Sequence, residues 1–210
     1  MVSKPSRGIT PEEGTETFAM LVPITDKSIK LYRELSEDVW AIQEFDQEGP
    51  YREAEVIPIV APTQEITEEG KYRTYITDAA DQTFQHLLES LEATLSLHGE
   101  YCEILRCILV RVKRGCKIYP HIDETFGDLS VKKYRMQIVR SSNEPFFNLC
   151  NRTTGEDTFI APRVKELREI PFGSLVAEEN MGLDDNIHML AYVQPKTGQQ
   201  ALKEVVAGWR

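Results

Sequence analysis

The 210-residue sequence contains few histidines, four in all, and it has no apolar run near the roughly 20 residues that a membrane-spanning helix requires. Basic residues are in the minority, 24 against 34 acidic ones, which gives a formal net charge of −10 at pH 7. This surplus of negative charge argues against nucleic acid as a partner, because a phosphate backbone binds clustered lysine and arginine. We therefore expect neither a nucleic-acid nor a membrane partner.

The four cysteines show no C-x-x-C spacing, which excludes a zinc ribbon and a thioredoxin-like redox motif. No apolar segment follows the charged N-terminal residues, so we expect no secretory signal and a cytoplasmic protein with buried free thiols. A hydrophobic content of 41% suffices for a core. We expect a flexible N-terminal arm over 1–17 and a single domain over 18–210.

Two amphipathic segments predict helices in the first half of the chain, one beginning near Thr25 and one covering 79–98. From residue 100 onward, β-prone segments dominate. The pattern predicts an α+β fold in which a helical part, 18–99, supports a β-rich core, 100–210, built as a sandwich or barrel. Strands are expected over 103–112, 117–123, 134–140, 173–177, 187–193 and 201–206.

His121 and Asp123 lie two residues apart on a predicted strand, so their side chains point to the same face. An imidazole and a carboxylate on one face can bind one metal ion, and another histidine would complete a facial triad for Fe(II). His86 and His98 belong to the helical part, which leaves His188 for that role. We predict His121, Asp123 and His188 as metal ligands and catalytic residues. The alternative is a hydrogen-bonded His–Asp pair on a surface strand.

The residues around this motif follow a recognisable order. The segment Arg111–Asp123 contains an arginine, a glycine turn and a Pro-His-x-Asp strand, and the strand Tyr134–Val139 lies downstream. This arrangement resembles the aspartyl/asparaginyl β-hydroxylase branch of the 2-oxoglutarate/Fe(II) oxygenases, which includes free-proline hydroxylases. The resemblance implies a double-stranded β-helix, which is a jelly-roll or cupin-like core, with Fe(II) as metal and 2-oxoglutarate as cosubstrate. It also implies an enzyme that uses O₂ to hydroxylate a C–H bond of an amino acid, free or within a peptide.

The same resemblance implies roles for individual residues. The His-x-Asp motif matches the first two iron ligands of the family. Arg135 matches a strand arginine that contacts the 2-oxoglutarate carboxylate, and Gln137 stands where a histidine is common. The family's later arginine, which follows the distal histidine, is missing from this sequence. The nearest substitutes for it are Lys196, Gln199 and Lys203.

Two registers are open for the final strands. In the first, Gly173–Ala177 is the strand that leads to the distal ligand, and His188 is that ligand. In the second, Asn186–His188 matches the family's terminal Arg-x-His strand, so the distal ligand is absent and Asn186 replaces the arginine. The second register favours a jelly-roll binding module without catalysis. A cupin-like metalloenzyme that uses no 2-oxoglutarate is a third hypothesis.

Four further segments carry weaker signals. Glu178 and Glu179 lie near the possible distal strand, and we expect them to be solvated loop acids. Charged and apolar residues alternate over 163–174, which predicts a lid or an edge strand. Loops over 46–80 and 144–172 are expected to set substrate specificity.

Overall fold

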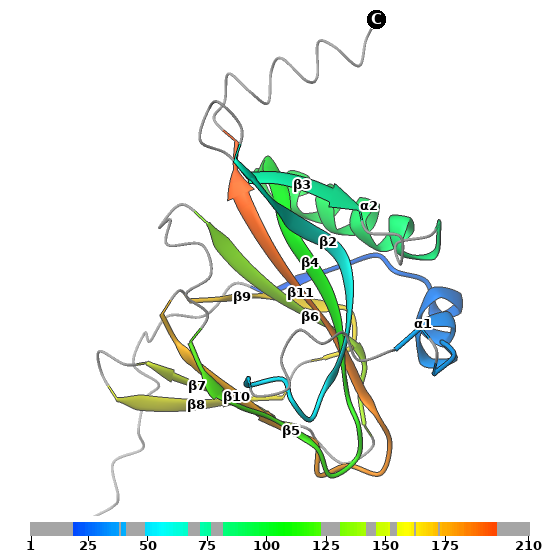
Figure 1. Ribbon diagram of the computed structural model, residues 1–210, viewed down its shortest axis with the longest axis vertical. Helices are drawn as coiled ribbons and strands as arrows, with labels where there is room; N and C mark the ends of the chain where they lie inside the picture. Colours follow the sequence, from blue (N-terminus) through cyan, green and yellow to red (C-terminus); the bar gives the residue numbers. More distant parts are fainter. Residues whose placement is uncertain are drawn as a thin grey trace, which may run out of the picture.

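A computed structural model describes residues 19–37, 39–40, 49–66, 72–76, 82–122, 131–141, 146–151, 155–161, 163–171 and 173–196. The expected N-terminal arm, Asp123, Gln199, Lys203 and the strand expected over 201–206 lie outside these residues. The described part contains two helices and eleven strands (Figure 1). The helices are α1 (Asp26–Arg33) and α2 (Gln82–Leu97).

The strands form two sheets in which every paired strand is antiparallel to its neighbour. The seven-stranded sheet contains, in spatial order, β1 (Ala19–Leu21), β9 (Glu166–Ile170), β6 (Lys132–Val139), β11 (Asn186–Pro195), β4 (Cys102–Val112), β2 (Glu55–Ile66) and β3 (Tyr72–Ile76). The four-stranded sheet contains β5 (Lys117–His121), β10 (Leu175–Glu179), β7 (Phe146–Asn151) and β8 (Glu156–Ile160).

The last eight strands pair in a nested order. β4 pairs with β11, β5 with β10, β6 with β9, and β7 with β8. The outermost pair and the β6–β9 pair lie in the larger sheet, and the other two pairs lie in the smaller sheet. This nested pairing across two sheets is the topology of an eight-stranded jelly roll. The predicted jelly-roll core is therefore present.

Most of the predicted elements are found, with shifted ends. The helix that begins after Thr25 ends at Arg33, and the Thr25 side chain caps it by accepting a hydrogen bond from the Ser28 amide. The segment 163–174 contains the strand β9, which pairs with both β1 and β6 and is not an edge strand. The strands β7 and β8 lie in the segment 144–172, for which the sequence predicts a loop, because neither strand shows a clear alternation of apolar and polar residues.

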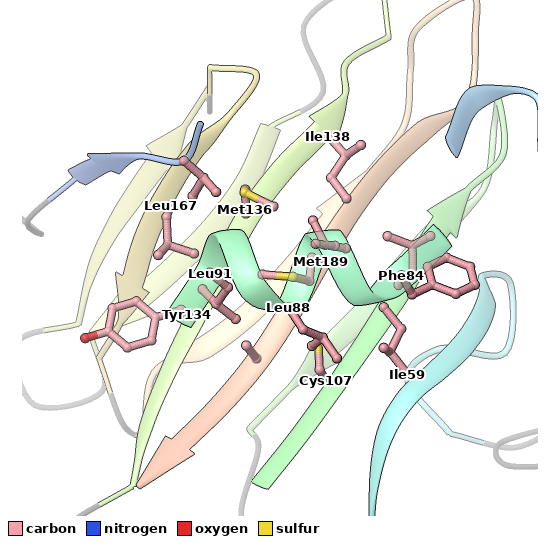
Figure 2. Packing of buried hydrophobic residues seen from close by; sticks show 14 of the residues in the cluster. Ile59, Phe84, Leu88, Leu91, Cys107, Tyr134, Met136, Ile138, Leu167 and Met189 are labelled. Atoms are coloured by element: carbon pink, nitrogen blue, oxygen red, sulfur yellow. The ribbon is translucent and has the colours of Figure 1, made fainter. Parts of the chain in front are cut away.

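The outer face of the seven-stranded sheet packs against α2. Leu87, Leu91 and Leu95 of α2 are fully buried and belong to one apolar cluster with Met136 of β6 and Met189 of β11. Figure 2 shows α2 lying across these strands, with Leu88 and Leu91 of the helix close to Met136 and Met189 of the sheet. Burial of each such leucine contributes about 1.5–3 kcal/mol of transfer free energy. Neither of the described helices is long and apolar enough to cross a membrane.

The four cysteines are free thiols. Cys107 is buried, as predicted, whereas Cys102, Cys116 and Cys150 are only partly buried. Burial raises the pKa of the Cys102 thiol to about 11, and it raises the pKa of Cys107 further. Both of these thiols are therefore protonated and poor nucleophiles at neutral pH.

Candidate active site between the two sheets

His121 is the last residue of β5 and is partly buried. Its Nδ1 lies 2.7 Å from the carbonyl oxygen of Tyr119, and its Nε2 lies 3.2 Å from the hydroxyl of Tyr51. A ring nitrogen that contacts a carbonyl carries the proton, which leaves Nε2 with the free electron pair. Metal-binding histidines typically have this arrangement, because the second nitrogen fixes the ring and its tautomer. His121 therefore suits a metal ligand through Nε2, in place of the Tyr51 hydroxyl.

The strand β10 lies beside β5 and presents two different side chains next to it. Val176 is the register partner of His121, and Glu178 is the partner of Ile118. The pairing is irregular between Val176 and Glu178, as at a β-bulge. The residue directly beside His121 is thus a valine, which cannot bind a metal ion, and a carboxylate follows two residues along the strand.

Five polar side chains meet between the two sheets, and we call them the interior polar cluster. They come from β6 and β11 of the larger sheet and from β10 of the smaller sheet. All are at most 3% exposed, so their polar atoms depend on one another rather than on water. The cluster consists of Arg135, Gln137, Glu178, Asn186 and His188.

An ion pair between Arg135 and Glu178 forms the centre of this cluster. Arg135 donates from Nη2 to Glu178 Oε2 at 3.0 Å and from Nη1 to Gln137 Oε1 at 2.8 Å. Glu178 accepts a second hydrogen bond at Oε1 from the side-chain amide of Asn186. Gln137 in turn donates to the Asn186 Oδ1 at 2.6 Å. The cluster therefore joins the two sheets through charged and amide groups.

His188 lies on β11, in register with Val110 on β4 and Gln137 on β6. Its Nδ1 is 3.5 Å from Glu178 Oε2 and has no hydrogen-bond partner, although it is buried. Burial lowers the pKa of His188 well below its usual value, and the charges of Arg135 and Lys133 add to this effect. The imidazole is therefore neutral at neutral pH, which is the state required of a metal ligand.

The fold brings together three of the predicted site residues, namely Arg135, Gln137 and His188. His121 lies on the neighbouring β5, where it pairs with Val176 of β10. Glu178 is two residues further along β10, beyond the irregular step in the pairing. Lys196 follows the end of β11, eight residues after His188, which is roughly 26 Å along the strand direction. The structure thus does not bring Lys196 to the cluster.

Asp123 and Gln199 are not among the described residues, so their positions in the site stay predictions. Within the described ranges, no three histidine, cysteine, aspartate or glutamate side chains lie close enough together to hold a metal ion. Because Asp123 lies outside that part of the chain, the triad of His121, Asp123 and His188 also stays a prediction.

The expectation that Glu178 is a solvated loop acid is wrong, because this residue lies within β10 and is 3% exposed. Its neighbour Glu179 is exposed, as expected. Apart from the alternation of faces along a strand, local sequence gives no signal that separates the two, since the partner that holds Glu178, Arg135, is 43 residues away. The alternation of faces along a strand was the one usable signal, and it required the strand to extend to Glu179.

No family model and no curated protein matches the sequence. Solved structures do match the fold. An oxidoreductase of the 2OG-Fe(II) oxygenase family from Burkholderia pseudomallei has 14% identity and a TM-score of 0.50, over 67% of each chain. The viral collagen prolyl hydroxylase of Paramecium bursaria Chlorella virus-1, solved with 2-oxoglutarate, has 9% identity and a TM-score of 0.53, over 88% of this chain and 98% of that one.

A third structure is HygX from Streptomyces hygroscopicus, solved with nickel, 2-oxoglutarate and hygromycin B. It has 10% identity and a TM-score of 0.54, over 87% of this chain and 84% of that one. The chain therefore has the jelly-roll fold found in 2-oxoglutarate/Fe(II) oxygenases.

The residues present fit the two groups that this fold implies to different degrees. The imidazole of His121, with Nδ1 held by a backbone carbonyl, suits iron. The neutral His188, with a buried nitrogen that lacks a hydrogen-bond partner, has the chemistry of a second nitrogen ligand. Arg135 is a buried cation of the type that a dicarboxylate requires, but it already holds the carboxylate of Glu178.

Proposed function

We propose that this protein is an Fe(II)- and 2-oxoglutarate-dependent oxygenase that hydroxylates a C–H bond of an amino acid, free or within a peptide. The observation that carries the proposal is the position of His121. It is the last residue of β5 in a jelly roll, and its Nδ1 lies within hydrogen-bond distance of a backbone carbonyl. Its partner on β10, Val176, is two residues before Glu178 of the buried arginine–carboxylate pair. The resemblance of the Pro-His-x-Asp region to the aspartyl/asparaginyl β-hydroxylase branch supports the class of substrate.

In this proposal, His121, Asp123 and His188 hold the iron, and Arg135 with Gln137 binds the carboxylate of 2-oxoglutarate. Iron and 2-oxoglutarate, when bound, supply the oxidant that hydroxylates the substrate. Arg135 suits its role because a guanidinium offers two parallel donors to a carboxylate, which lysine does not. Gln137 holds Arg135 in position through its Oε1. The jelly roll, 18–210 in our proposal, excludes water from these groups.

A second candidate function is a jelly-roll binding module without catalysis. Two observations favour it. The residue paired with His121 is Val176, and the residue on β11 that corresponds to the family's arginine in the second register is Asn186. In that register, Glu178 and Asn186 complete a cluster that serves to join the sheets.

The experiment that separates these functions is the anaerobic addition of Fe(II) and 2-oxoglutarate to the full chain. We expect a weak visible charge-transfer band in the wild type, and we expect His121→Ala to remove it. His86→Ala is the matched control, since the His86 side chain is 79% exposed and lies on α2. No band in the wild type, together with sub-stoichiometric iron after reconstitution, would support the binding module instead.

A further inference from the structure

Arg135 is the buried cation to which the proposed function assigns a carboxylate ligand, and in this structure it holds a carboxylate of the protein itself. The Arg135 Nη2 to Glu178 Oε2 distance is 3.0 Å, and both side chains are 3% exposed. Glu178 reaches across from β10 to an arginine on β6, so the contact joins the two sheets. The remaining carboxylate oxygen accepts from Asn186, which also lies on the larger sheet.

We propose that the carboxylate of Glu178 occupies the anion-binding site at Arg135, so that a carboxylate ligand binds there only in competition with Glu178. This inference rests on the proposed function, because it concerns the same cation. It makes Glu178 a specificity-determining residue that sets how tightly the site takes a dicarboxylate.

The surroundings of Glu178 explain why the competition is strong. Asn186 donates to one carboxylate oxygen, and Arg135 donates to the other. A ligand that takes Arg135 from Glu178 leaves a buried carboxylate without its cation, and an unpaired buried charge is strongly unfavourable. The cost of leaving Glu178 unpaired makes the binding free energy of the ligand less favourable. The wild-type chain should therefore bind 2-oxoglutarate weakly.

The first test compares the affinity of the full chain for 2-oxoglutarate, with Fe(II) and without oxygen, in the wild type and two variants. Glu178→Gln keeps the size and shape of the side chain and removes its charge, and we expect it to bind 2-oxoglutarate at least ~10-fold more tightly than the wild type. Glu179→Gln, which changes the exposed neighbour, should bind as the wild type does. Unchanged or weaker binding by Glu178→Gln would overturn the inference.

The second test needs neither iron nor 2-oxoglutarate. Glu178→Ala should lower the urea midpoint of unfolding, and acetate should restore it by filling the vacated place, relative to chloride at equal ionic strength. Neither Glu179→Ala nor the double variant Arg135→Met, Glu178→Ala should respond to acetate. An equal response to acetate in the wild type and in Glu178→Ala would contradict the inference.

The two tests separate the inference from the proposed function. Tight binding of 2-oxoglutarate that no change at Glu178 affects would overturn the inference and keep the function. Rescue of Glu178→Ala by acetate, with no iron-dependent binding of 2-oxoglutarate in any variant, would overturn the proposed oxygenase function. It would still support an anion-binding site at Arg135.

Discussion

At the scale of single residues, Glu178 is a buried carboxylate that depends on partners in the other sheet. Its carboxylate is buried, and residues on two strands of the opposite sheet contact it. Removing one member of a buried ion pair typically costs 3–5 kcal/mol, because the other charge remains without compensation. Arg135 and Glu178 therefore depend on each other, and neither is expected to tolerate an apolar replacement alone.

His188 gives a prediction at the same scale. Its pKa is lowered in the folded state by burial and by the charges of Arg135 and Lys133, so the unfolded chain binds a proton first as the pH falls. Stability is then complete above the usual histidine pKa of about 6.5 and decreases below it, by up to about 1.4 kcal/mol per pH unit. In metal-free protein, His188→Gln should weaken this dependence, as measured by urea unfolding between about pH 7.5 and pH 5.5, which is roughly one unit either side of that pKa.

The exposed His86 is the control for this prediction, and His86→Gln should leave the pH dependence unchanged. The same slope in His188→Gln and in the wild type would show that other groups cause the acid sensitivity.

At the scale of elements, α2 stabilises the outer face of the larger sheet through a row of buried leucines. Leu91 is 0% exposed, whereas Leu97 at the end of the same helix is 84% exposed. Leu91→Ala should lower the free energy of unfolding by about 2–5 kcal/mol, because it leaves a cavity between helix and sheet. Leu97→Ala should change it by less than about 0.5 kcal/mol. Chemical denaturation of both variants tests this, and similar losses would mean that α2 does not cover the sheet.

The pair β5 and β10 shows which part of the site local sequence could predict. His121 was found because its partners are local, with the Pro-His-x-Asp motif and the carbonyl of Tyr119 within two residues. The face and burial of Glu178 depend on an irregular register between β5 and β10 and on Arg135 in the other sheet. No periodicity within 173–179 contains that information, so the local sequence predicts a solvent-exposed Glu178.

At the scale of the whole molecule, the nested strand pairing places the interior polar cluster. β6 and β11 are neighbours in the larger sheet, and β10 faces them from the smaller sheet, so residues up to 53 positions apart in sequence meet. The sequence could predict β4, β5, β6, β10 and β11 from their β-prone residues, and it could predict a jelly roll from the resemblance. It could not predict β7 and β8, nor which strands pair with one another in the two sheets, because both depend on tertiary contacts.

The whole-molecule charge of −10 makes a buried cation important for an anionic cosubstrate. The most direct test of the proposed function is therefore the iron-dependent formation of succinate from 2-oxoglutarate by the full chain in air. The account predicts succinate in the wild type with Fe(II), none without Fe(II), and a loss of at least ~100-fold in His121→Ala. Equal succinate formation by the wild type and His121→Ala, or none by the wild type at saturating 2-oxoglutarate, would contradict it.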